Sequence, residues 1–108
     1  MIRFSVFRSG DHYKGFSCEG HAEWADEGHD IVCAAASALV FNTMNSIESL
    51  TEDEFSGEQA EDGGYVKFVF AETPSDAATL LVDSLVLGMQ SILEEYGEDF
   101  ISIESSEE

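Results

Sequence analysis

The chain has very few basic residues. Only Arg3, Arg8, Lys14 and Lys67 oppose 23 aspartate and glutamate residues, and the formal net charge of the 108 residues is −19. A surface of this sign repels nucleic acid and anionic membranes, and at low salt it attracts basic partners. The composition therefore argues against direct binding to nucleic acid or to a membrane. It is also compatible with a simple role in solubility or in adaptation to high salt.

Proline, cysteine and long apolar runs are scarce as well. One proline and two cysteines are present, and without a repeat or a linker we predict a single domain over residues 1–108 with an acidic tail at 104–108. No segment approaches the roughly 18 apolar residues expected of a membrane span, and the alternating N-terminus does not resemble a signal peptide. We therefore expect a cytoplasmic protein whose cysteines stay reduced, rather than a Cys18–Cys33 disulfide.

The apolar pattern predicts strand, strand, helix, strand, strand, helix and strand, in that order. The strands are expected at residues 2–8, 15–21, around 55, 64–71 and 100–103, and the helices at 31–50 and from 73 to about 96. Thr73 is expected to cap the second helix, Pro74 suits its first turn, and Gly97 ends it. The economical arrangement is an α+β two-layer sandwich, with two helices packed on one face of a mixed or antiparallel sheet.

Cys33 stands where the chain turns from a loop into the first predicted helix. We predict Asp30 as the N-cap, which makes Cys33 the third helical residue. The unpaired N–H groups and the positive dipole of a first turn favour a thiolate, and so does a nearby histidine. His21 ends the second predicted strand and could meet Cys33 across the loop, as in nucleophilic catalysis. The alternative is that Cys33 is an inert, buried small side chain.

Two neighbours could support this pair. Ser37 lies one helical turn beyond Cys33 on the same face and could hydrogen-bond near the sulfur. It could equally be a small residue that permits close packing. Asp30 could hold His21 in a useful tautomer, as the third member of a triad does.

The loop at residues 22–29 lies between the two predicted catalytic residues. It contains Trp24, an aromatic side chain suited to a lid or a partner contact, and Gly28, a candidate hinge. We interpret both as substrate-binding residues in a lid over a peptide groove. Trp24 could instead be a hydrophobic plug over the helix start.

A zinc site is the competing interpretation of the cysteines and histidines. Cys18 and His21, followed by His29 and Cys33, form two pairs with spacing similar to that of zinc ligands. Cys18 and His21 are an odd number of residues apart, however, so a regular strand directs them to opposite faces. The gap between the pairs is also shorter than a usual finger loop. We therefore expect no metal and no cofactor, and keep a zinc-binding module as an alternative.

The string Gly20-His21-Ala22, followed by Asp30-Ile31-Val32-Cys33-Ala34-Ala35 and Ser37, resembles the ribosomal-processing cysteine protease family, Prp. The resemblance covers essentially the whole chain and implies that family's small α/β fold. It implies a homodimeric enzyme that removes a short N-terminal extension from a large-subunit ribosomal protein (number twenty-seven). The family's catalytic cysteine and histidine fall on Cys33 and His21. Its supporting glycine, aspartate and serine fall on Gly20, Asp30 and Ser37.

The sequence thus predicts a cytoplasmic cysteine endopeptidase. Cys33 attacks the scissile carbonyl, His21 takes its proton and returns it to the leaving amine, and N–H groups near the helix start stabilise the oxyanion. The acidic surface offers a way to hold a basic ribosomal protein. Besides the zinc-binding module, a second alternative is a non-catalytic, acidic, ribosome-associated interaction protein in which Cys33 is merely buried.

Overall fold

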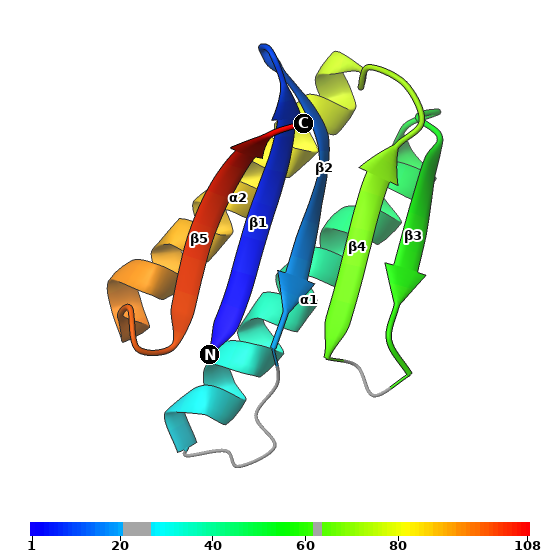
Figure 1. Cartoon of the computed structure of the whole chain (residues 1–108). Helices are drawn as coiled ribbons and strands as arrows, with labels where there is room; N and C mark the ends of the chain where they lie inside the picture. The colour runs from blue at the N-terminus through cyan, green and yellow to red at the C-terminus, as the bar shows by residue number, and fades with distance from the viewer. Residues whose placement is uncertain (21–26, 62–63) are drawn as a thin grey trace.

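The strands form one mixed sheet with both helices on the same face (Figure 1). The computed structural model describes residues 1–20, 27–61 and 64–108. In chain order the elements are β1 (Ile2–Ser9), β2 (His12–Glu19), α1 (Glu27–Leu50), β3 (Phe55–Gln59), β4 (Tyr65–Phe70), α2 (Asp76–Tyr96) and β5 (Ile101–Glu107). The five strands lie in the order β3-β4-β2-β1-β5, and only β1 and β5 pair in parallel. The predicted α+β sandwich and order of elements are confirmed.

The core lies between the sheet and the two helices. β1 alternates as predicted, with the side chains of Ile2, Phe4 and Val6 buried. The ring of Phe68 stacks on that of Phe16 at 4.7 Å between centroids, which joins β4 to β2. Each helix contributes a stripe at helical spacing: Val32, Ala36, Val40 and Ile47 from α1, and Ala78, Val82, Leu85, Met89 and Ile92 from α2. Burial of these stripes supplies most of the drive for the helices to pack on the sheet.

The first helix begins earlier than predicted. α1 starts at Glu27, so Asp30 lies within the helix and is not its N-cap. Gly28 belongs to the first turn of α1 and is not a hinge in a loop. The alanine-rich run identified the helix itself. Its first residue was missed because a helix start without a strong capping signal is poorly defined by sequence.

The cap of α2 is also different from the predicted one. Thr73 was predicted to cap this helix, but the N-cap is Ser75. Its hydroxyl accepts a hydrogen bond from the backbone N–H of Ala78. Ser75 is itself held by the carboxylate of Asp53, which accepts from its N–H at 2.8 Å and from its hydroxyl at 2.5 Å. The segment between α1 and β3 therefore fixes the start of α2.

The predicted acidic tail is a strand. β5 continues to Glu107 and pairs with β1 as far as Arg8. A carboxylate oxygen of Glu107 accepts a hydrogen bond from the Gly10 N–H at 2.6 Å, and the N–H of Glu108 donates to the Arg8 carbonyl at 2.7 Å. Residues 104–107 are therefore ordered by pairing with the edge of β1, although their acidic composition favours an exposed tail.

Both helices are apolar enough, by length and composition, to pass a test for membrane spans. The segments are Ile31–Leu50 and Asp76–Tyr96, each with a mean hydropathy of 1.3. The expectation that no segment is long and apolar enough to span a membrane is therefore wrong, as judged by length and composition. In the structure each helix packs one side against the sheet, as core helices do.

Candidate active site

Gly20 fixes the point at which the chain leaves β2. Its φ of +110° lies in a region that favours glycine. Its N–H donates to the Gly64 carbonyl at 2.9 Å, and a Cβ at this position would lie 2.2 Å from the Met1 carbonyl oxygen. No other residue fits here without moving backbone. Gly20 therefore sets the position from which the next residue, His21, departs.

Cys33 and Ser37 lie one turn apart on α1, as predicted. Both are partly buried, and Cys33 packs against the core. Because α1 starts at Glu27, Cys33 lies about 9 Å along the helix axis from that start. The prediction that Cys33 occupies the first turn is therefore wrong. The unpaired N–H groups of the helix start are too distant to act on its sulfur directly.

The second cysteine, Cys18, lies in the core on β2. Burial, followed by the charges of Cys33 and Glu19, raises the pKa of its thiol to about 11. Neither cysteine is in a disulfide. Because the reactive form of cysteine is the thiolate, Cys33 is the better placed of the two thiols for chemistry at neutral pH.

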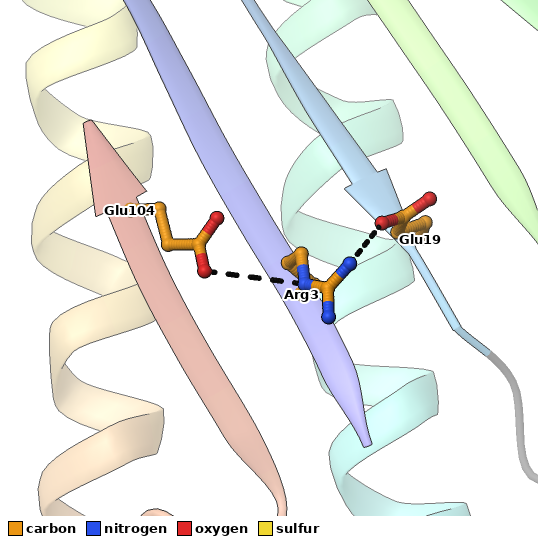
Figure 2. Close-up of polar contacts among 3 residues, drawn as sticks. All are labelled: Arg3, Glu19 and Glu104. Carbon is orange, nitrogen blue, oxygen red and sulfur yellow. Dashed lines mark hydrogen bonds and ion pairs between the residues drawn. The ribbon is translucent and has the colours of Figure 1, made fainter. Parts of the chain in front are cut away.

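A hollow of about 370 Å³ adjoins Gly20. It is lined by Met1, Arg3, Glu19, Gly20 and Gly64. The Nη1 of Arg3 donates to Oε1 of Glu19 at 2.9 Å, and its Nε lies 4.0 Å from a carboxylate oxygen of Glu104 (Figure 2). The guanidinium thus links β2, β1 and β5 across the sheet.

Sequence reasoning did not find this group. Arg3 and Glu19 are far apart in the chain and meet only because the β1–β2 register sets them opposite each other. The alternation of the two strands was visible in the sequence, but not their register.

Of the predicted site residues that the structure describes, Gly20 and those in the first turn of α1 lie at the same end of the fold. Figure 1 shows the end of β2, where Gly20 lies, and the start of α1 at the same end of the molecule. His21 and Trp24 lie outside the described residues, so their predicted roles concern a part of the chain that the structure does not describe. Asp30 and Gly28 are placed by backbone only, within α1.

The four side chains of the zinc alternative are only half described. Cys18 and Cys33 are placed on β2 and α1, whereas His21 and the side chain of His29 lie outside the description. A zinc site here would need the thiolate of Cys18, and the raised pKa of that buried thiol opposes this ionisation.

The family model described as cysteine protease Prp matches residues 1–101. A protein named ribosomal processing cysteine protease Prp from Staphylococcus aureus (strain Mu50 / ATCC 700699) is 37% identical over 81 residues, which are 75% of this chain and 76% of that protein. A protein of the same name from Bacillus subtilis (strain 168) is 35% identical over 103 residues, 89% of this chain and 90% of that one.

Solved structures agree with this result. A crystal structure of an essential ribosomal processing protease Prp from S. aureus, in complex with a substrate peptide, superposes with a TM-score of 0.90 at 30% identity, covering 98% of this chain and 100% of that one. The same protease with a covalently linked product peptide gives 0.88 at 31% identity, covering 98% and 100%. SMU.848 from Streptococcus mutans gives 0.88 at 28% identity, covering 100% and 96%.

Proposed function

The chain belongs to the cysteine protease Prp family and is a cysteine protease of ribosomal processing. From this premise we propose that it removes a short N-terminal extension from a large-subunit ribosomal protein (number twenty-seven). Two observations carry the proposal: Cys33 lies partly buried on α1, and Gly20, with its positive φ, ends the described part of the chain after β2 directly before His21 in sequence. The relative from S. aureus that was crystallised with a covalently linked product peptide supports a covalent step.

The proposed chemistry proceeds through an acyl-enzyme. The Cys33 sulfur attacks the scissile carbonyl while His21 accepts the thiol proton. His21 then gives that proton to the leaving amine, and the carbonyl carbon remains bound to sulfur as a thioester. His21 next takes a proton from water, the resulting hydroxide attacks the thioester, and the Cys33 thiol is restored.

Three residues are proposed to support these steps. Gly20 holds the strand end before His21 in place, since its backbone is fixed by Met1 and Gly64. Ser37, one turn beyond Cys33 on α1, is proposed to hydrogen-bond near the reacting sulfur. Asp30 is proposed to orient the imidazole of His21.

The surroundings of the site are proposed to select the substrate. Trp24 and Gly28 flank the start of α1 in sequence and are proposed to contact the bound peptide. The acidic surface, with its net charge of −19, is proposed to attract the basic ribosomal protein before cleavage.

The enzyme is proposed to act in the cytoplasm, where a thiol nucleophile stays reduced. It is also proposed to work as a homodimer, as the family resemblance implies.

Incubation with the purified precursor tests the proposal. We expect one cleavage near the N-terminus, located by mass spectrometry and N-terminal sequencing of the product. His21→Ala is expected to lose this activity, because no base then accepts the thiol proton. His12→Ala, at a partly exposed position on β2, is the matched control and is expected to cleave like the unmodified chain. An intact precursor with the unmodified chain, or an active His21→Ala, would contradict the proposal.

A further inference from the structure

One side of β3 presents its backbone hydrogen-bonding groups at the edge of the sheet. In the part of the chain that the structure describes, β3 pairs only with β4 (Figure 1). The N–H of Ala60, directly after β3, donates to the Tyr65 carbonyl of β4 at 2.9 Å. Because alternate residues of an antiparallel strand face alternate sides, the N–H and C=O groups of Phe55, Gly57 and Gln59 point to the open edge.

This edge lacks the features that usually prevent another chain from pairing with a strand. Residues 55–59 contain no lysine and no proline, and the printed register of β3 with β4 is regular. Every residue of β3 after Phe55 is exposed. Gly57 has no side chain, and a Cβ at its position would lie 3.4 Å from the methyl carbon of Met44 on α1. An extended chain can therefore lie along β3 without meeting a large side chain at its centre.

The charges beside this edge select the kind of chain that binds. Glu52 and Glu54 precede β3, and Glu58 lies within it, all three exposed. Among the described residues, no cation lies within ion-pair distance of these carboxylates. Lys67 is opposite Glu58 in the strand register, but its Nζ lies 5.3 Å from the centre of the Phe7 ring, toward β1. A segment with lysine or arginine side chains gains here, whereas a second copy of this chain, also at −19, is repelled.

The opposite edge of the sheet, β5, suits a basic segment less well. A carboxylate oxygen of Glu104 already lies 4.0 Å from the Nε of Arg3 (Figure 2). The carboxylate of Glu107 accepts a hydrogen bond from the N–H of Gly10 at 2.6 Å. The carboxylates of β5 thus have partners within the chain, and those beside β3 are left for another molecule.

The edge of β3 can be reached from the active-site end of the fold. β4 is antiparallel to both β2 and β3, so β2 and β3 end at the same end of the sheet. A strand added beside β3 would lie about 14 Å from β2, a distance that about five extended residues span. A chain that leaves the site near Gly20 can then run along the edge from Gln59 toward Phe55, antiparallel to β3.

We infer that the open edge of β3 binds an extended, basic segment of the precursor as a sixth, antiparallel strand. The segment lies downstream of the scissile bond, in the part of the precursor that becomes the mature protein. Its backbone pairs with the residues of β3 that face the edge, and its lysine or arginine side chains lie beside Glu58. The inference rests on the proposed function for the identity of this chain. It adds a second contact that holds the precursor away from the catalytic residues.

Fluorescence anisotropy of a labelled octapeptide of alternating valine and lysine tests the edge directly. The unmodified chain is expected to bind it saturably at low salt. Gly57→Pro removes an outward N–H at a position where an edge strand tolerates proline. It is expected to weaken binding about tenfold or more, because the ring also blocks the adjacent hydrogen bonds. Gly57→Ala adds a Cβ but keeps the N–H, and is expected to weaken binding by less than about twofold.

The charge at the edge is tested with the same octapeptide. Glu58→Lys is expected to weaken binding about tenfold at low salt, because like charges then lie beside each other on neighbouring strands. The matched control is Glu95→Lys, the same change of net charge at an exposed position on α2. It is expected to weaken binding by less than about twofold. Equal weakening by the two variants would overturn the inference, because the total charge would then attract the peptide.

Two further results would overturn the inference: no saturable binding by the unmodified chain, or folded Gly57→Pro and Glu58→Lys variants that bind like it. If Gly57→Pro loses its circular dichroism spectrum, a fully N-methylated octapeptide removes the same hydrogen bonds from the other side. It is expected not to bind, and undiminished binding would contradict the strand pairing.

Precursor cleavage is measured on the same samples. Glu58→Lys is expected to raise KM for the whole precursor about tenfold, and Glu95→Lys is not. Cleavage of the precursor without binding of the octapeptide contradicts only this inference. Binding of the octapeptide without cleavage contradicts only the proposed substrate.

Discussion

Cys18 on β2 lies near enough to Cys33 on α1 for the charge of Cys33 to help raise the pKa of the Cys18 thiol. The two thiols differ in access, because Cys18 is buried while Cys33 is only partly buried. Burial is the larger cause of the raised pKa of Cys18. The fold therefore distinguishes between two cysteines that the composition leaves equivalent.

Alkylation follows from this difference. In the folded chain at neutral pH, iodoacetamide is expected to modify Cys33 first, because the pKa of about 11 keeps Cys18 protonated. Peptide mapping by mass spectrometry locates the label, and modification at Cys33 is expected to track loss of cleavage. Cys18→Ala is the control and is expected to stay active and to be labelled once. Equal labelling of both thiols in the folded protein would contradict the account.

Gly20→Ala is expected to impair both folding and cleavage. The new Cβ would lie 2.2 Å from the Met1 carbonyl oxygen at a φ of +110°, so β2 or the N-terminus must shift. A displacement of about 1 Å beside a catalytic residue costs on the order of 100-fold in kcat. The readouts are kcat and the urea midpoint.

Gly10→Ala is the matched control. Gly10 also has a positive φ, +61°, but has no atom within 4 Å of the added Cβ. It is expected to lose about 1–2 kcal/mol of stability from backbone strain alone, with kcat unchanged. If both variants lost activity equally, the close contact of Gly20 with Met1 would not matter to the site.

Asp53→Asn is expected to destabilise the fold in a pH-dependent way. Hydrogen bonds from Ser75 hold the pKa of Asp53 below its ordinary value of 3.8. A lowered pKa in the folded state stabilises above 3.8, and this stabilisation is lost as pH falls through the folded value. Urea unfolding should therefore show a loss of about 1 kcal/mol at neutral pH that shrinks in acid. Glu72→Gln, the same charge change at an exposed position, is the control, and a loss independent of pH would contradict the assignment.

Salt is expected to separate the two parts of substrate recognition. If the net charge of −19 gathers a basic precursor, kcat/KM for the whole precursor should fall as the screening length shrinks from about 30 to 8 Å. A short apolar peptide that spans only the cleavage site should change little. Equal salt sensitivity of the two substrates would remove attraction by charge and leave solubility as its role.

The sequence was sufficient for the fold class because its periodicities are strong. Alternation identified the buried face of β1 correctly. The helical stripe of α2 was correct at Ala78, Leu85, Met89 and Ile92. It was wrong at Tyr96, which is exposed, and at Leu81, which is only partly buried while its neighbour Val82 is fully buried. Boundaries that depend on tertiary contacts were missed. Ser75 caps α2 because Asp53 reaches it from another segment, and Glu107 is in a strand because β1 offers a free edge.

The candidate site was partly predictable for a similar reason. Cys33 and Ser37 stood out through local spacing and Gly20 through the family resemblance. The structure sets the first two on α1 and Gly20 at the end of β2. Arg3 and Glu19 did not stand out, since their contact depends on strand register. Because α1 begins at Glu27, Cys33 lies beyond the first turn, and the predicted stabilisation of its thiolate by the helix dipole is wrong.

Cleavage of the precursor by Cys33→Ala tests the central claim most directly. Alanine removes little volume and suits the helix, so this variant is expected to keep the circular dichroism spectrum and urea midpoint of the unmodified chain. With the nucleophile gone, mass spectrometry should detect no N-terminal product, while the unmodified chain and Cys18→Ala both release it. A folded Cys33→Ala that still releases the product would contradict the account.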